Sequence, residues 1–366
     1  MPAVWFGFCN GSGEKITRPM NYGISILFRA IPLVMAAFCF AYGAYVYAAG
    51  DDPSRLTAGP VVFFLGSICV ALYCTAATII RQIIGTYNKA ARYAFPVIGY
   101  SFALATFICG LLIIGSHWAG AYVTGHVVCG LGLIAACVAT AATSSTKFAL
   151  IPRNSADAAF AINPSGFTRR TAVILVGIAG LAALAAWIWS FVLFATASLP
   201  AHTVAGSVML GIACVCTSLI ALVASIVRQV RGTYRMNESS RWMSLVVSMG
   251  VVAFIAGLLM IFAHWGGAID FVGFVLIGLA LICWSISSKV ILLGKVWHAD
   301  YPLARRIPII PVLTALTCLF LAAFLFEEAL FKPRFFVPAR VLTGFGAICF
   351  TLFSIVSILE SGANRK

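Results

Sequence analysis

Residues 123–144 read VTGHVVCGLGLIAACVATAATS, an uninterrupted run without a charged side chain. A helix needs about 20 mainly apolar residues to cross a hydrocarbon core of roughly 30 Å, because its backbone polar groups must be paired within the segment. The same kind of run recurs on both sides of this one, and the sequence therefore predicts an all-α membrane protein with ten transmembrane helices. The other nine are expected at 30–49, 58–80, 95–115, 171–194, 204–227, 244–263, 271–292, 307–326 and 337–359.

The composition agrees with a chain that lies mostly in lipid. Hydrophobic residues make up 62% of the chain and charged residues 9%, with a mean hydropathy of +1.04, whereas a soluble domain has about 45–50% apolar and about 25% charged residues. The first 22 residues lack the apolar core and the cleavage site of a signal peptide, so we expect the first span to direct its own insertion. The 12 cysteines form no C-x-x-C pair, which indicates neither a disulfide framework nor a metal site.

The formal net charge of +14 follows the predicted topology. If the N-terminus is cytoplasmic, 20 of the 24 basic residues fall on the cytoplasmic side, as the positive-inside rule requires. The sequence therefore predicts five tandem helical hairpins with both termini in the cytoplasm, and the charge indicates no nucleic-acid partner. Only four basic residues are expected on the outer side: Arg55, Lys332, Arg334 and Arg340. The inner set is Lys15, Arg18, Arg29, Arg81, Lys89, Arg92, Lys147, Arg153, Arg169, Arg170, Arg228, Arg231, Arg235, Arg241, Lys289, Lys295, Arg305, Arg306, Arg365 and Lys366.

An internal repeat organises the chain. The sequence RQIIGTY at 81–87 recurs as RQVRGTY at 228–234, and the register holds at an offset of 147 residues through the neighbouring loops. Because each copy holds an even number of spans, the two copies are parallel. We divide the chain into a first four-helix repeat at 1–150, a cytoplasmic linker at 151–170, a second repeat at 171–298, and a fifth hairpin with the C-terminus at 299–366.

A finer repeat marks the outer end of every even-numbered span. A small residue, a variable residue and a valine follow one another in five aligned triplets, and another small residue comes seven positions later. A spacing of seven returns to nearly the same helix face, so the small residues form a stripe that favours close helix packing, although such a stripe also suits a pore lining. The triplets are Gly59-Pro60-Val61, Gly125-His126-Val127, Gly206-Ser207-Val208, Gly273-Phe274-Val275 and Ala339-Arg340-Val341.

Two sets of candidate residues come from these triplets. Glycines of the stripe are assigned to helix packing: Gly59, Gly66, Gly125, Gly132, Gly206, Gly273 and Gly346. The variable position is the candidate pore or rim position: Pro60, His126, Ser207, Phe274 and Arg340.

Four of the five histidines are expected at the outer ends of spans. Protonation near pH 6.5 would add positive charge to this rim as the outside acidifies, which makes them candidate pH-responsive residues. Hydrogen bonding to backbone or lipid headgroups is the plainer interpretation, and haem ligation by paired histidines is a third. The four are His117, His126, His202 and His264.

The sequence contains no motif in a context that indicates a soluble enzyme domain, so we expect no catalytic residue. Charged residues deep inside the predicted spans are nearly absent, and ion-coupled transporters commonly keep such residues there. A proton-coupled pump is therefore disfavoured.

Several stretches together resemble the YhiM-like bacterial inner-membrane proteins, and the resemblance runs nearly end to end. It implies a multi-span protein of the Gram-negative inner membrane linked to survival under acid and other envelope stress, without a known substrate or catalytic residues. The family repeats Gly-His-Val in more than one hairpin, whereas Pro60 and Ser207 replace histidine here, which weakens a mechanism based on a ring of histidines. The stretches are RAIPL at 29–33, FPVIGY at 95–100, VTGHV at 123–127, LIPRN at 150–154, RIPIIPV at 306–312 and CFTLFSIVSILE at 349–360.

Three functional hypotheses remain open. The first is a stress-adaptation protein that acts as a passive channel or facilitator for an unidentified small molecule or ion. The second is a non-transporting structural or interaction protein, and the third is a haem or quinone redox module. The first two need no cofactor and have the lipid bilayer as their partner. Five similar hairpins suggest a pseudo-symmetric ring, and assembly into a homo-oligomer stays open.

Overall fold

A computed structural model describes residues 22–49, 52–84, 89–146, 168–197, 199–231, 233–262, 269–297 and 307–363. This part of the chain holds ten helices that are long and apolar enough to cross a membrane and no β-strand, which confirms the predicted all-α class with ten spans. The predicted linker at 151–170 lies almost wholly outside the described residues. The helices are α1 (Tyr22–Ala48), α2 (Pro53–Ile84), α3 (Lys89–Ile114), α4 (Ala121–Thr146), α5 (Arg169–Ala195), α6 (Pro200–Val230), α7 (Met236–Phe262), α8 (Asp270–Trp297), α9 (Ile309–Ala329) and α10 (Phe336–Ala363), with a short 3-10 helix η4 (Pro333–Phe335).

Most helices extend beyond the apolar runs that predicted them. The run at 58–80 becomes α2, Pro53–Ile84, because helical hydrogen bonding continues into polar residues at both membrane faces. Asp52 caps its start by accepting a hydrogen bond from the backbone N of Ser54 at 3.2 Å. Lys289, which the sequence analysis counted with the basic residues of the cytoplasmic side, lies inside α8 and is 2% exposed, so its ammonium group is within the bundle.

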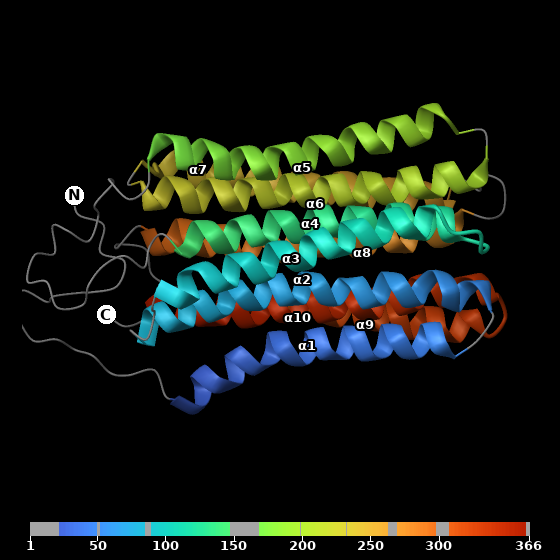
Figure 1. The fold of residues 1–366 in the computed structure, drawn as a ribbon, viewed down its shortest axis with the longest axis horizontal. Helices are drawn as coiled ribbons and strands as arrows, with labels where there is room; N and C mark the ends of the chain where they lie inside the picture. Colours follow the sequence, from blue (N-terminus) through green and yellow to red (C-terminus); the bar gives the residue numbers. More distant parts are fainter. Residues whose placement is uncertain are drawn as a thin grey trace, which may run out of the picture.

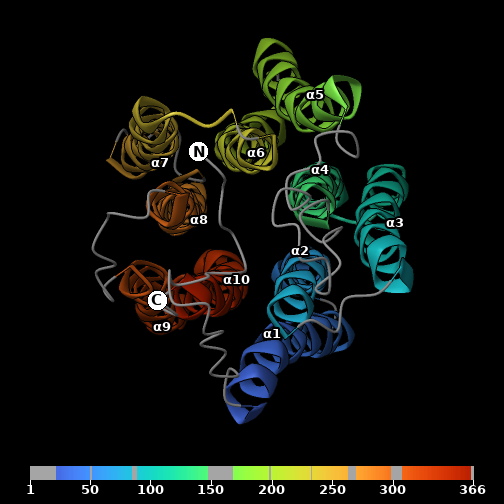
Figure 2. The same ribbon diagram turned by 90° about the vertical axis from the view of Figure 1, so that its left-hand side faces the viewer.

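The ten helices form two concentric layers, seen end-on in Figure 2. Each even-numbered helix packs on two others, and α10 packs on α2 as well as on α8, so α2, α4, α6, α8 and α10 form a closed ring. Each odd-numbered helix packs outside this ring against the helix that follows it in the chain (Figure 1). In the most apolar stretch of each span, 78–83% of residues are buried in the even helices and 22–33% in the odd helices. The odd helices therefore present their apolar side chains to lipid.

Hydrogen bonds between chain-distant residues join the last inner helix to the first pair. The hydroxyl of Ser354 in α10 donates to the carbonyl of Phe28 in α1 at 2.7 Å, and Arg340 Nη1 donates to Ser54 Oγ in α2 at 3.2 Å. The start of α1 and the end of α10 thus lie at the same end of the bundle, and one chain closes the ring.

The striped glycines face the odd helix of their own pair. A Cβ at Gly125 would lie 2.6 Å from the backbone N of Ile114 in α3, and one at Gly59 would lie 2.8 Å from the backbone N of Tyr47 in α1. These distances leave no room for a methyl group, so the helix backbones touch there. The other five face their own pair in the same way: Gly66 against Phe40, Gly132 against Phe107, Gly206 against Leu193, Gly273 against Gly257 and Gly346 against Leu319.

Candidate functional site

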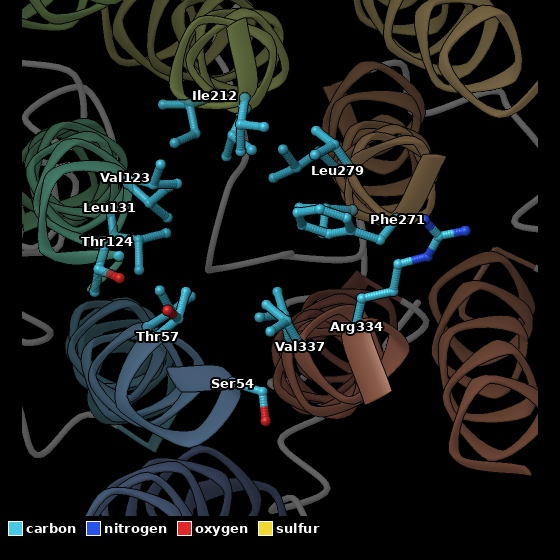
Figure 3. Close-up of a pocket in the computed structure, with 18 of the residues that line it drawn as sticks. Ser54, Thr57, Val123, Thr124, Leu131, Ile212, Phe271, Leu279, Arg334 and Val337 are labelled. Atoms are coloured by element: carbon cyan, nitrogen blue, oxygen red, sulfur yellow. The ribbon is translucent and has the colours of Figure 1, made fainter. Parts of the chain in front are cut away.

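A cavity of about 320 Å³ lies inside the ring, at the end where α2, α4, α6, α8 and α10 begin (Figure 3). All five inner helices line it, together with Gly120 before α4 and Arg334 in η4. From the distribution of basic residues we expect this end on the outer side of the membrane. We call this cavity the vestibule.

The repeated valine of each triplet faces the vestibule, so the five copies form one layer of its wall: Val61, Val127, Val208, Val275 and Val341. Four residues earlier, one helical turn nearer the mouth, a second layer consists of Thr57, Val123, Val204, Phe271 and Val337. Four residues later, Leu131, Ile212, Leu279 and Phe345 form the floor. The vestibule is therefore a fivefold pseudo-symmetric funnel with an apolar wall.

Three consecutive residues of each triplet point to three different neighbours, because successive helical residues are rotated by about 100°. The small residue faces the odd helix of its own pair, and the valine faces the vestibule. The variable residue faces the next pair around the ring. His126 packs on Trp189 of α5, with ring centroids 5.6 Å apart, and Phe274 packs on Phe335 of η4 at 6.0 Å.

The candidate pore or rim residues therefore lie between pairs rather than on the cavity wall. None of the five variable residues lines the described vestibule. Ser207 in α6 donates to the Thr203 carbonyl at 2.7 Å and lies 4.0 Å from the sulfur of Met260 in α7. Pro60, in the corresponding place on α2, is half-buried.

Arg340 occupies the seam where the last pair meets the first. Its side chain is 8% exposed, donates to Ser54, lies over the ring of Phe336 at 5.0 Å and is beside Tyr42 of α1. Arg340, which the sequence analysis expected as an exposed charge on the outer side, is thus buried inside the protein. There it contacts residues of α1, α2 and α10.

The mouth of the vestibule is polar on two opposite sides (Figure 3). Ser54, Thr57 and Thr124 lie on the side of α2 and α4. Arg334 lies on the other side and forms an ion pair with Asp270, with 2.7 Å between Nη2 and Oδ2. The charges of Arg334 and Asp270 therefore compensate each other. The uncharged polar groups of the wall are the hydroxyls of Ser54, Thr57 and Thr124.

Beyond the floor, buried aliphatic side chains fill the ring. The residues seven positions after each valine are Ile68, Ile134, Val215, Ile282 and Ile348, and none is more than 4% exposed. Those eleven positions after it are Leu72, Val138, Leu219, Ile286 and Leu352, also at most 4% exposed. Both spacings return to the vestibule face of the helix, so an apolar stretch about two turns long closes the inner end of the vestibule.

Two of the four outer histidines meet around one tyrosine. The ring of Tyr122 lies 4.3 Å from that of His126 and 5.0 Å from that of His202. Each histidine donates from Nδ1 to a backbone carbonyl, His126 to Tyr122 at 2.7 Å and His202 to Thr196 at 2.6 Å. His117 is exposed in the connection between α3 and α4, and His264 lies outside the described residues. His126 and His117 therefore differ in setting, and no shared ligand position joins them.

Lys289 is the polar residue that sequence reasoning missed. It is the largest fully buried side chain of the described residues, and it lies one turn beyond Ser285 in the inner half of α8. Among the described residues it takes part in no ion pair or hydrogen bond. The signal was available in the sequence, because the apolar pattern of this helix continues for several residues past the lysine.

Comparisons with known proteins agree with this architecture. The model of a protein family described as "Protein of unknown function (DUF2776)" matches residues 20–364. The "Inner membrane protein YhiM" of Escherichia coli strain K12 is 42% identical over 350 residues, which cover 95% of this chain and 100% of that protein. No solved structure matches. The resemblance stated from the sequence motifs is thereby confirmed.

Proposed function

Since this chain belongs to the DUF2776 family, we propose that it is a polytopic inner-membrane protein that acts as a passive facilitator for small uncharged solutes. The observation that carries the proposal is the vestibule, which one chain encloses with five pseudo-equivalent helices. Solute sites in helical membrane proteins lie between helices of a bundle, where side chains replace lipid.

The proposed topology has five hairpins and both termini in the cytoplasm. Its support is the distribution of basic residues, 20 of 24 on one side. In this orientation the vestibule opens to the outer side, and its floor faces the cytoplasm. One chain closes the ring, so the proposed unit needs no second copy.

The apolar wall favours uncharged solutes over ions. Among the described residues that line the vestibule there is no carboxylate, histidine or cysteine, and the cation Arg334 is paired with Asp270. An ion that leaves water needs compensating polar groups, and this wall offers hydroxyls only. The same composition supports a transport role over an enzymatic one, since the wall presents neither a nucleophile–base pair nor a metal-ligand set.

The aliphatic stretch beyond the floor acts as a closed gate in this proposal. Apolar constrictions stop water and solutes by dewetting, and a small widening restores the passage. Neighbouring inner helices touch where a glycine of one meets a large side chain of the next, as Gly211 meets Leu279 and Gly344 meets Leu65. In this proposal, rotation of one pair against the next widens the stretch.

The pair of histidines around Tyr122 supports a link to acid stress, which the family resemblance implies. His126 and His202 join α4 and α6 on the outer side, beside the vestibule. If both rings become charged at low pH, their repulsion and the cost of burying His126 would loosen this contact. We propose that flux rises as the outer solution acidifies.

Reconstituted liposomes test the proposal. The full chain is placed in lipid vesicles, and the entry of glycerol, urea, potassium ions and protons is followed with the outer solution at pH 5 and at pH 7. We expect glycerol or urea entry above that of protein-free vesicles, greater at pH 5, and no potassium current. The matched control is Val275→Trp, which fills the vestibule and should abolish the entry. Absence of flux for every probe at both pH values would overturn the proposal.

The filled inner half favours one second candidate, a non-transporting structural or interaction protein of the inner membrane. Its aliphatic layers are buried to the same degree as a soluble core. Two results would support this second candidate over the first. Vesicles that contain the protein would remain impermeable, and cells with the Val275→Trp variant would show the wild-type phenotype.

A further inference from the structure

The vestibule is large enough for a molecule of moderate size. Its volume of about 320 Å³ is roughly twice that of an apolar protein cavity that holds benzene. It also lies at the lower end of the roughly 300–1,000 Å³ range of ligand pockets. Valine and phenylalanine side chains from the five inner helices form most of the wall, so the larger part of an occupant must be apolar.

One hydroxyl on the wall lacks a hydrogen-bond partner. Thr124 is fully buried, and its Oγ1 makes no hydrogen bond within the described part of the chain. Other threonines in the inner helices donate to the carbonyl four residues earlier, as Thr140 does to Ala136 at 2.8 Å and Thr351 to Ala347 at 2.9 Å. Leaving a buried hydroxyl unpaired is costly, and the arrangement is explained if an occupant of the vestibule supplies the partner.

A second hydroxyl lies close to the first. Thr57 of α2 and Thr124 of α4 are neighbours on the same side of the vestibule (Figure 3). Gly120, with φ of +93°, brings the chain past Thr57, and a Cβ there would lie 2.6 Å from the Thr57 Oγ1. The backbone of Gly120 therefore lies directly against the Thr57 hydroxyl, while the opposite wall at Phe271 and Leu279 is apolar.

The charges around this corner are already compensated. Arg334 is paired with Asp270, and Arg340 is turned away from the vestibule toward the seam with α1. An occupant with a net charge would gain little here and would lose its hydration. The polar end of the occupant is therefore uncharged.

From these observations we propose that the vestibule is a binding site for an uncharged amphipathic molecule, one apolar body with a single hydroxyl or carbonyl oxygen. The oxygen bonds to the hydroxyls of Thr57 and Thr124, and the apolar body lies against the valine layer and Phe271. This inference rests on the proposed function, since it names the chemistry of the solute that the vestibule admits.

The test uses the full chain in phosphatidylcholine nanodiscs with a photoactivatable octanol that carries a diazirine on its chain. After irradiation, mass spectrometry locates the labelled residues. We expect adducts on the valine layer, Val127, Val208 or Val275, and competition by 1-octanol at concentrations at least tenfold lower than those needed with octyl sulfate or octylammonium. Adducts restricted to the lipid-facing odd helices, or equal competition by all three compounds, would overturn the proposal.

Two variants separate binding from folding. Thr124→Val keeps the shape and removes the unpaired hydroxyl, so we expect an unchanged or higher melting temperature and about five- to tenfold weaker octanol competition. Thr78→Val, whose equally buried hydroxyl donates to the Cys74 carbonyl at 2.8 Å within its own helix, is the matched control and should leave the competition unchanged. Equal competition for Thr124→Val and the wild type would contradict the placement of the oxygen.

The outcome can be told apart from that of the flux experiment. Labelled valines in a protein without flux would remove the facilitator and leave the binding site. Glycerol flux that Val275→Trp abolishes, combined with no label on the valine layer, would remove the amphipathic ligand and leave the facilitator.

Discussion

The outer and inner halves of the five-helix ring share one backbone arrangement and have opposite interiors. Helix axes packed 8–10 Å apart in a ring of five lie about 8 Å from its central axis, which leaves a space that side chains must fill. In the outer half the layer of five valines borders an open space of about 320 Å³, whereas the two inner layers, isoleucine and leucine together with Val138 and Val215, are closed. The larger side chains at most of the inner positions favour the closed state of that half.

The two halves also differ in the polar group that lacks a partner. The outer half holds the hydroxyl of Thr124, a residue that lines the vestibule. The inner half holds the ammonium group of Lys289 in a filled region. The first arrangement suits a binding site, and the second is a cost to stability that a function of the inner half would have to justify.

The largest effect is expected where the outer half depends on backbone contact between α3 and α4. In Gly125→Leu the new side chain would meet the backbone of Ile114 and Gly110, which cannot move without separating the two helices. We expect a loss of more than about 3 kcal/mol in the free energy of unfolding, seen as a sharp fall in the monodisperse fraction on size exclusion. Gly180→Leu is the control, because nothing lies within 4 Å of a Cβ there, and similar yields for the two variants would contradict the close contact.

The next effect concerns the closed inner half. Ile282→Ser removes apolar bulk from the layer beyond the floor and should let water pass, raising the osmotic water permeability of proteoliposomes by about tenfold or more. The control is Ile255→Ser on the lipid-facing side of α7, which is 50% exposed. Melting temperatures check that both variants are folded, and a permeability equal to that of the wild type in a folded Ile282→Ser protein would show that this layer is not the barrier.

A smaller effect of opposite sign is expected at the buried lysine. Lys289→Met keeps a similar volume and removes an ammonium group without an acidic partner, so we expect the unfolding free energy to rise by about 2 kcal/mol. Thermal unfolding in nanodiscs measures the change, with the exposed Lys332→Met as control. A lower stability of Lys289→Met would mean that the ammonium group has a favourable partner, such as a bound anion.

The smallest effect is expected at the outer edge of the ring, where Asp52 caps α2. Hydrogen bonds from the Ser54 side chain and backbone lower the pKa of Asp52 in the folded protein. Asp52 therefore contributes fully to the free energy of unfolding above its pKa in the unfolded chain, about 3.9, and this contribution is lost as the pH falls through its pKa in the folded protein. Asp52→Ala should cost about 0.5–1 kcal/mol at pH 7. The difference from the wild type should shrink as the pH falls below the unfolded value, and a difference that grows on acidification would contradict the cap.

The sequence was sufficient to predict the ten spans because lipid imposes length and apolar composition on every helix. It also located the triplets, but the direction of each residue depends on the packing of all five pairs. Val61 and its equivalents, which were not among the candidate residues, line the vestibule, whereas His126, a candidate pore or rim residue, faces the next pair. Lys289 was counted with the inner basic residues, although the predicted span at 271–292 already contained it.

The central claim is that the ring is hollow at the valine layer and closed beyond its floor. Single cysteines at Val275 and Ile282, two helical turns apart on one face of α8, test it directly when the reconstituted protein reacts with a small uncharged maleimide and mass spectrometry measures the rate at each site. We predict that the cysteine at 275 reacts at least tenfold faster than the one at 282. Equal rates at the two positions would contradict the claim.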